Sequence, residues 1–210
     1  MTCFSLNEIE AMGKRAARGA GLTWGLAEEA GKAVRWLTAC QLPGPEMLNE
    51  ILTFNDGTDY VELSPVSVET VWQARSGRLC PLVAGPSLSD HALDLAAGGE
   101  IELGKTIKPL MLAAYAAVAA KLTGVAIELV WPGAIVIVTP QGISIEGDHV
   151  NASLVEGVRC RRTATKQNVT EEGLLGREVD VEAWDNLSLF MHRYLAPNTE
   201  ESRAAGAGPD

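Results

Sequence analysis

The segment Gly99-Glu-Ile-Glu-Leu-Gly-Lys-Thr106 has the G-x-x-x-x-G-K-[ST] spacing of a phosphate-binding P-loop. Such a loop wraps phosphates with backbone N–H groups at the start of a helix that follows a buried parallel strand. Here Glu100 and Glu102 would repel a polyphosphate, and Pro109 would fall inside the first turns of that helix. The surrounding residues therefore favour a strand followed by a helix cap at Thr106, and nucleotide binding is the less favoured interpretation.

The three histidines, His91, His149 and His192, occur in no spacing that is typical of a metal site. The four cysteines are also scattered and form no C-x-x-C pair, which argues against zinc and against a catalytic dithiol. Ser89 and Asp90 precede His91 directly, but neighbours on a helix point in different directions and cannot form a relay with one another. We expect no metal, and the sequence names no cofactor.

Two clusters combine charged and aromatic side chains in the way that binding sites often do. The first lies in one predicted helix, where the alternative is a Glu28–Lys32 ion pair beside a packed Trp24. The second spans the last predicted helix and the tail, where the alternative is a capped turn and a frayed end. These two clusters and His91 supply the candidate residues. The candidate catalytic residues are Glu28, His91 and His192, and the candidate ligand-binding residues are Trp24, Arg35, Glu200 and Arg203.

These residue types support two hypotheses. In the first, the protein is an accessory or small-molecule-binding protein that forms a homo-oligomer through a helix face of small residues, Leu6 to Ala20. In the second, it is a small metal-independent enzyme acting on an anionic carboxylate metabolite. Arginine would then hold the carboxylate, and histidine or glutamate would move a proton. The sequence leaves open whether the protein is an enzyme.

Charge and hydropathy narrow the class of partner. The formal net charge of −10 and the pI near 4.8 argue against nucleic acid and against an anionic membrane surface. The longest apolar run, Pro109 to Ala120, is shorter than the roughly 20 residues that cross a bilayer. Charged residues follow the first six residues at once, unlike a secretory signal. We therefore predict a cytoplasmic protein, which the scattered cysteines also suit.

The elements that must position these residues can be read from caps and periodicity. Ser5 begins a capping box, and Thr23 can cap a second helix from Trp24 to Cys40, which gives an N-terminal helical pair. A helix is predicted from about Glu46 to Phe54. Further predictions are strands at Tyr60–Leu63 and Leu79–Ala84, and a helix from Ser87, with a capping box at Asp90, to Gly98.

The second half has the clearest pattern. Val125–Trp131, Ala134–Thr139 and Ile143–Glu146 are rich in β-branched residues and are separated by tight turns, which predicts an antiparallel meander. Val158–Thr163 adds a strand, and Asp180 caps a last helix. The fold class is therefore α+β, with the apolar helix Pro109–Leu122 packed on the sheet. We predict one domain, residues 1–197, and a flexible tail, residues 198–210.

Several segments near both ends resemble an uncharacterised bacterial protein family of about 200 residues. The resemblance is carried by Ser5–Glu10, Ala16–Gly21, Trp24–Gly31, Val34–Leu37, Ala196–Arg203 and Gly206–Gly208. It covers both ends of the chain well and the middle loosely. The resemblance implies a bacterial, cytoplasmic protein, and it supplies no activity, cofactor or catalytic residue.

Overall fold

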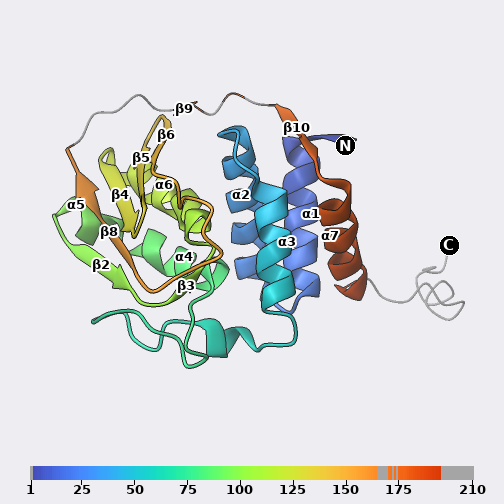
Figure 1. The fold of residues 1–210 in the computed structure, drawn as a ribbon, viewed down its shortest axis with the longest axis horizontal. Coiled ribbons are helices and arrows are strands. Elements are labelled where there is room, and N and C mark those ends of the chain that lie inside the picture. Colours follow the sequence, from blue (N-terminus) through green and yellow to red (C-terminus); the bar gives the residue numbers. More distant parts are fainter. Residues whose placement is uncertain (1, 165–169, 172, 174, 195–210) are drawn as a thin grey trace, which may run out of the picture.

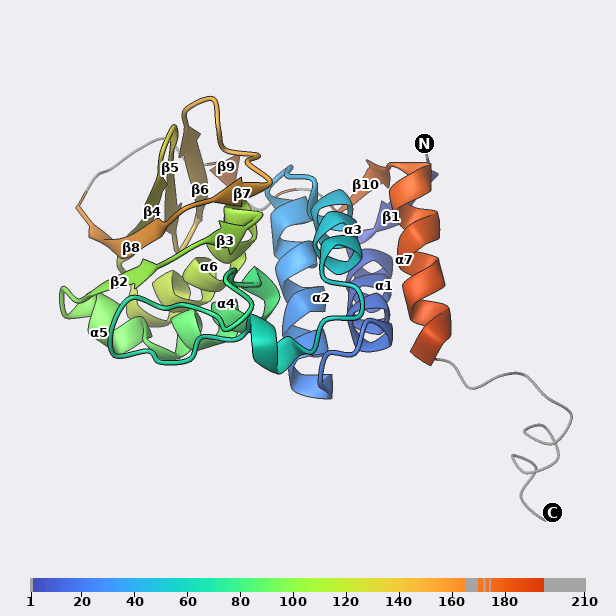
Figure 2. The same ribbon diagram turned by 60° about the horizontal axis from the view of Figure 1, so that its bottom comes forward.

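A computed structural model describes residues 2–164, 170–171, 173 and 175–194, which form a group of packed helices beside a sheet (Figure 1). The first group consists of α1 (Leu6–Gly19), α2 (Trp24–Ala39), α3 (Gly44–Phe54) and α7 (Val181–Tyr194). The second contains α4 (Pro81–Asp90), α5 (Ala92–Ala96) and α6 (Leu112–Thr123), which lie against the sheet (Figure 2). The predicted α+β class is confirmed.

The main sheet is antiparallel, with the strand order β2-β8-β4-β5-β6-β9. Its strands are β2 (Glu100–Leu103), β4 (Ala126–Trp131), β5 (Ala134–Thr139), β6 (Gly142–Glu146), β8 (Val158–Thr163) and β9 (Thr170–Glu171). Two short pairs join β1 (Thr2–Ser5) to β10 (Gly176–Val179) and β3 (Thr106–Ile107) to β7 (Leu154–Val155). The predicted meander corresponds to β4, β5 and β6.

The core is continuous through the helix group and the layer between α6 and one face of the sheet. Leu129 of β4 is paired with Val136 of β5 and with Cys160 of β8, and none of the three is exposed to solvent. The helix α6 contacts β4 and β5, and eight of its twelve residues are buried. Burial of this much apolar surface is the main stabilising contribution in such a layer. The predicted packing of an apolar helix on the sheet is therefore confirmed.

Helix starts follow the predicted caps. The Ser5 hydroxyl accepts a hydrogen bond from the Glu8 N–H, and the Glu8 carboxylate accepts one from the Ser5 N–H at 2.8 Å. Thr23 caps α2, and Asp180 accepts a hydrogen bond from the Ala183 N–H at 3.0 Å. Among the described residues no helix is both long and apolar enough to cross a membrane.

Three of the local predictions before Gly99 are wrong. Leu79–Ala84 is not a strand, because α4 begins at Pro81, and the helix expected from Ser87 to Gly98 is divided at His91 between α4 and α5. Tyr60–Leu63 forms the 3-10 helix η1 instead of a strand. The helix α4 contacts both α2 and α6, so its apolar residues lie on more than one side and give no amphipathic period.

The α1–α2 contact depends on small residues. A Cβ atom built on Gly31 would lie 2.7 Å from the Glu10 carbonyl oxygen, and one on Gly13 would lie 3.4 Å from the Gly31 Cα. Ile9 and Ala16, on the same face of α1, are buried. The small-residue face therefore packs within the chain, so it is not free to form the homo-oligomer for which it was considered.

Gly31→Ala should lower the free energy of unfolding by about 1–3 kcal/mol, because the added methyl group would push α1 and α2 apart. Gly25→Ala, on the same helix, is the matched control, because a Cβ there meets no atom within 4 Å. It should stay within about 1 kcal/mol of wild type, on the stabilising side, since alanine favours helix. Urea unfolding of both variants measures the difference, and equal effects would contradict the close contact.

Arg193 joins the last helix to the end of α3. Its guanidinium makes two hydrogen bonds to the Asp56 carboxylate, at 2.5 and 3.0 Å, and these hold the pKa of Asp56 below its ordinary value. A lowered folded-state pKa means that the stabilisation is complete above the unfolded pKa near 3.9 and is lost as the pH falls through the folded value. Both side chains are more than one-third exposed, so the contribution is below about 1 kcal/mol.

Asp56→Asn should therefore reduce stability slightly at pH 7, and the difference from wild type should disappear as the pH falls through the lowered folded-state pKa of Asp56. Thermal unfolding at several pH values measures this difference. Asp148→Asn, in an exposed loop, is the control for the loss of one charge. A difference that grows toward low pH would contradict the sign of the Asp56 shift.

Candidate functional site

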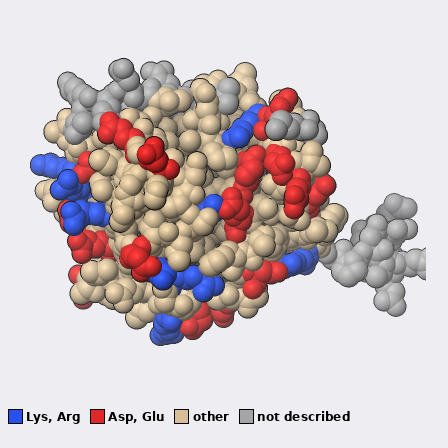
Figure 3. Space-filling model, in the orientation of Figure 1, with Lys and Arg blue, Asp and Glu red and all other residues tan. Residues whose placement is uncertain are grey.

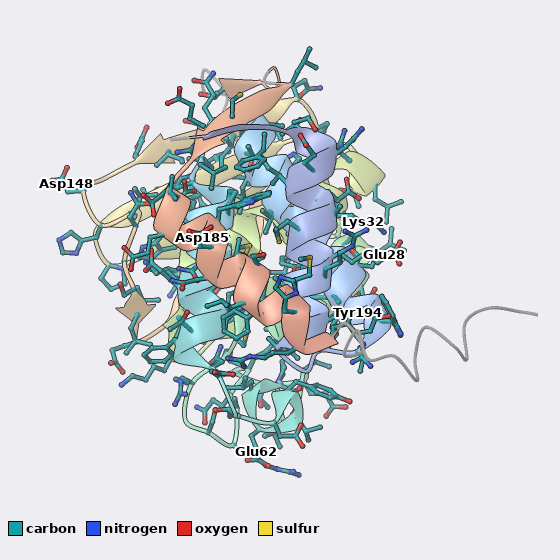
Figure 4. The ribbon with its side chains drawn as sticks, turned by 90° about the vertical axis from the view of Figure 1, so that its right-hand side faces the viewer. Glu28, Lys32, Glu62, Asp148, Asp185 and Tyr194 are labelled. Atoms are coloured by element: carbon teal, nitrogen blue, oxygen red, sulfur yellow. The ribbon has the colours of Figure 1, made fainter. Side chains whose placement is uncertain are left out.

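The predicted cluster on α2 is an exposed seam of ion pairs with α1. Glu28 lies 3.6 Å from the Lys14 ammonium and 3.9 Å from that of Lys32. Arg35 donates to the Asn7 side chain at 2.5 Å and lies 3.2 Å from the Glu10 carboxylate. Glu28 and Lys32 are neighbours on one side of the helix group (Figure 4). The Glu28–Lys32 ion pair that the sequence offered as the alternative is present.

Trp24 lies where the first and last helices meet. Its ring is half exposed and contacts the edge of Tyr194 with the ring centroids 5.1 Å apart. The Arg18 guanidinium is 5.4 Å from the Trp24 ring centroid and 5.8 Å from that of Tyr194, within the range of cation–π attraction. The end of α1, the start of α2 and the end of α7 therefore meet at this point, and exposed His192 lies in the last turn of α7.

His91 is placed elsewhere. It lies between α4 and α5, on the other side of α2 from α7 (Figure 1). Its Nδ1 is 2.8 Å from the Ser87 carbonyl oxygen, and its ring meets the edge of Trp72 at a centroid distance of 5.4 Å. The structure therefore does not bring His91 to the α2 cluster. Glu200 and Arg203 lie outside the described residues.

Gly99–Thr106 lacks the geometry of a P-loop. Glu100–Leu103 forms β2, as predicted, but it pairs with β8 in an antiparallel sheet. Gly104 is followed by β3, not by a helix, and the Lys105 ammonium pairs with Glu156 at 3.0 Å. Thr106 is not a cap: it lies in β3, and the next helical turn, η2 (Pro109–Met111), follows Lys108.

A cleft between α2 and α6 was not foreseen from the sequence. Its volume is about 380 Å³, within the usual range for small-molecule sites. The walls are mainly alanines with one indole, and the charged groups come from both helices. The apolar lining is Leu6, Ala33, Trp36, Ala39, Ala114, Ala117, Val118 and Leu175, and the remaining lining is Glu29, Lys32, Arg35, Tyr115, Lys121 and Gly173.

The sequence places these groups by helical spacing. On α2, residues 29, 32, 33, 36 and 39 recur at intervals of three and four, and on α6 residues 114, 117, 118 and 121 do the same. Alanine at four of these nine positions, 33, 39, 114 and 117, leaves space between the two helices. The pattern on each helix is visible in the sequence, but the facing of one helix by the other is not.

The charged residues that line the cleft are mostly cations. They are Lys32, Arg35 and Lys121 with one acid, Glu29, whose carboxylate lies 2.8 Å from the Lys32 ammonium and raises the pKa of Lys32. Lys32 and Arg35 also pair with Glu28 and Glu10 of the neighbouring seam. By contrast, acidic side chains gather over α3 and α7 (Figure 3), where Glu50, Asp180 and Asp185 are exposed. An organic anion would thus be attracted to the cleft and repelled from the α3–α7 face.

Tyr115 lies under the cleft and is only 1% exposed. Burial raises its pKa well above the ordinary value, so its side chain is a neutral phenol. No metal-binding group of three or more His, Cys, Asp or Glu side chains occurs in the described part of the chain. The arrangement suits recognition of an anionic group next to an apolar body.

Residues 4–80 match the model of a family described as a protein of unknown function (DUF3726). The expected resemblance to an uncharacterised family is confirmed by this match. The matched region contains α1, α2 and α3, and so the α2 wall of the cleft, but not α6. The search of curated proteins found no match.

Proposed function

We propose that the protein binds a small organic anion with an apolar body in the α2–α6 cleft. The observation that carries this proposal is the pairing of alanine and tryptophan walls with three cations, Lys32, Arg35 and Lys121, at one cavity. Arg35 was a candidate ligand-binding residue from the sequence. A carboxylate would lie among these cations, and its alkyl or aryl part would lie against Trp36.

Binding is favoured over catalysis by the placement of the other candidates. Glu28, His91 and His192 are not among the residues that line the cleft, and neither is Trp24. The enzyme hypothesis would require one of them to reach an anion held by Arg35. In line with the family resemblance, we further propose that the protein is bacterial and cytoplasmic. The homo-oligomer also stays a proposal, through a surface other than the buried Leu6–Ala20 face. Light scattering measures the oligomeric state, and a strictly monomeric protein would contradict the proposal of a homo-oligomer.

Straight-chain carboxylates from butanoate to decanoate should raise the melting temperature, with the shift increasing until the chain fills the cleft. Each buried methylene contributes about 0.8 kcal/mol, which makes the series a measure of the apolar walls. The corresponding alcohols should shift the melting temperature less, because they lack the charge. Equal shifts for alcohols and carboxylates, or none with either series, would overturn the proposal.

Two variants separate charge from shape. Lys121→Gln should weaken carboxylate binding up to about fivefold, the value of an exposed ion pair, and leave alcohols unaffected. Ala114→Leu should weaken both classes, because the larger side chain occupies the cavity. Lys105→Gln, whose partner is Glu156 away from the cleft, is the control for charge and should bind like wild type in calorimetric titrations.

A further inference from the structure

Cys80 lies at the N-terminus of α4 with its side chain buried. Burial raises the pKa of its thiol to about 12, although hydrogen bonds from the N–H groups of Leu82 and Val83 and the charge of Arg78 act in the opposite direction. The named polar neighbours all favour the thiolate form of Cys80. Only the exclusion of water from the sulfur opposes its ionisation.

Two more polar side chains are buried nearby without satisfied hydrogen bonds. The amide nitrogen and oxygen of Asn55 have no nitrogen or oxygen partner among the described residues, and this amide lies at the Cys80 sulfur, a weak acceptor. The Tyr115 hydroxyl also has no partner, and Cys80 is close enough to raise its pKa further. Leaving such groups unpaired destabilises the conformation in which they are buried.

A cavity of about 420 Å³ lies against this cluster, separate from the α2–α6 cleft. Cys80 and Asn55 line it, together with apolar side chains that include Leu22, Ile51 and Leu82. One side of the cavity is formed by residues 57–61, which we name the flap; four of them, Gly57 to Tyr60, are lining residues.

The flap is attached mainly to itself. The Thr58 N–H bonds to the Asn55 carbonyl, the Val61 N–H to the Asp59 side chain, and the Ser64 side chain to the Tyr60 carbonyl. These bonds, and that from Glu62 N–H to the Asp59 carbonyl, all stay within residues 55–64. The flap contains the first two residues of η1, and it can move without breaking a strand pair or an α-helix. Such local attachment is the behaviour of a low-stability local unit.

We propose that Cys80 is a covered nucleophile, which the flap exposes to small neutral α,β-unsaturated amides entering through this cavity. The Asn55 amide would pair with the carboxamide of the ligand, as donor and as acceptor. The thiolate sulfur bonds to the β-carbon, the π electron pair moves to the α-carbon, and that carbon takes the proton that the thiol released to water. The product is a thioether, and no oxidant or reductant is needed.

Cys160 provides an internal control. It is fully buried in β8, between β2 and β4, and burial likewise raises its pKa. Exposing it requires opening of the main sheet, whereas exposing Cys80 requires movement of the flap alone. The ratio of the two labelling rates in one sample therefore compares local with global opening.

The test uses acrylamide at pH 8 and peptide mass spectrometry of the full chain. Cys80 should be labelled at least tenfold faster than Cys160. Asn55→Leu should slow Cys80 labelling at least threefold, because the closed state loses its unpaired amide and the ligand loses its partner, without lowering the melting temperature. Lys121→Gln should leave the Cys80 rate unchanged, which separates this site from the proposed anion cleft.

Equal labelling rates for Cys80 and Cys160 in the wild type would overturn the proposal, and this comparison needs no variant. A lower melting temperature with faster labelling of both thiols in Asn55→Leu would also overturn it, because Asn55 would then be a structural residue. Replacing acrylamide with propionamide, which has no double bond, should give no adduct at either thiol.

Discussion

The close contact of α1 with α2 is the constraint on which the other helix positions depend. It exists because Gly31 has no Cβ to meet the Glu10 carbonyl oxygen, and because Gly13 faces it from α1. The same device occurs on the other side of α1, where a Cβ on Gly19 would lie 1.8 Å from the Phe190 carbonyl oxygen of α7. With α1 held on both sides, α2 is fixed in position, and its opposite side is available for α3, α4 and α6.

The helix α2 consequently serves two parts of the molecule. Toward α1 its side chains form the ion-pair seam that includes Glu28 and Arg35, and toward α6 its alanines leave a cleft. Exposed ion pairs of this kind contribute little to the free energy of unfolding. The main effect of the seam is therefore to hold the cationic side chains in position. Arg35 belongs to both surfaces. This shared position explains how an apolar cavity comes to have a positively charged rim in an acidic protein.

The core contains a local conflict around the start of α4. Several buried polar atoms of the described residues lack a hydrogen-bond partner, and those of Asn55 and Tyr115 lie next to the Cys80 thiol. Buried polar groups are normally hydrogen-bonded, and exceptions concentrate where a protein has a use for them. The 420 Å³ cavity and the locally bonded flap lie at the same place. Two separate regions, the α2–α6 cleft and the cavity at Cys80, thus depart from simple packing.

The sequence by itself determined the features that neighbouring residues control: the caps at Ser5, Thr23 and Asp180, the β4–β6 meander, and the absence of a P-loop helix after Gly104. It failed at α4, which is apolar on more than one side because two helices cover it. Only the tertiary structure decided the site, since Ala33 and Ala114 form one cleft although 81 positions separate them (114 − 33). Local hydrogen bonds and periodicity fix an element, whereas the pairing of distant faces depends on packing of the whole chain.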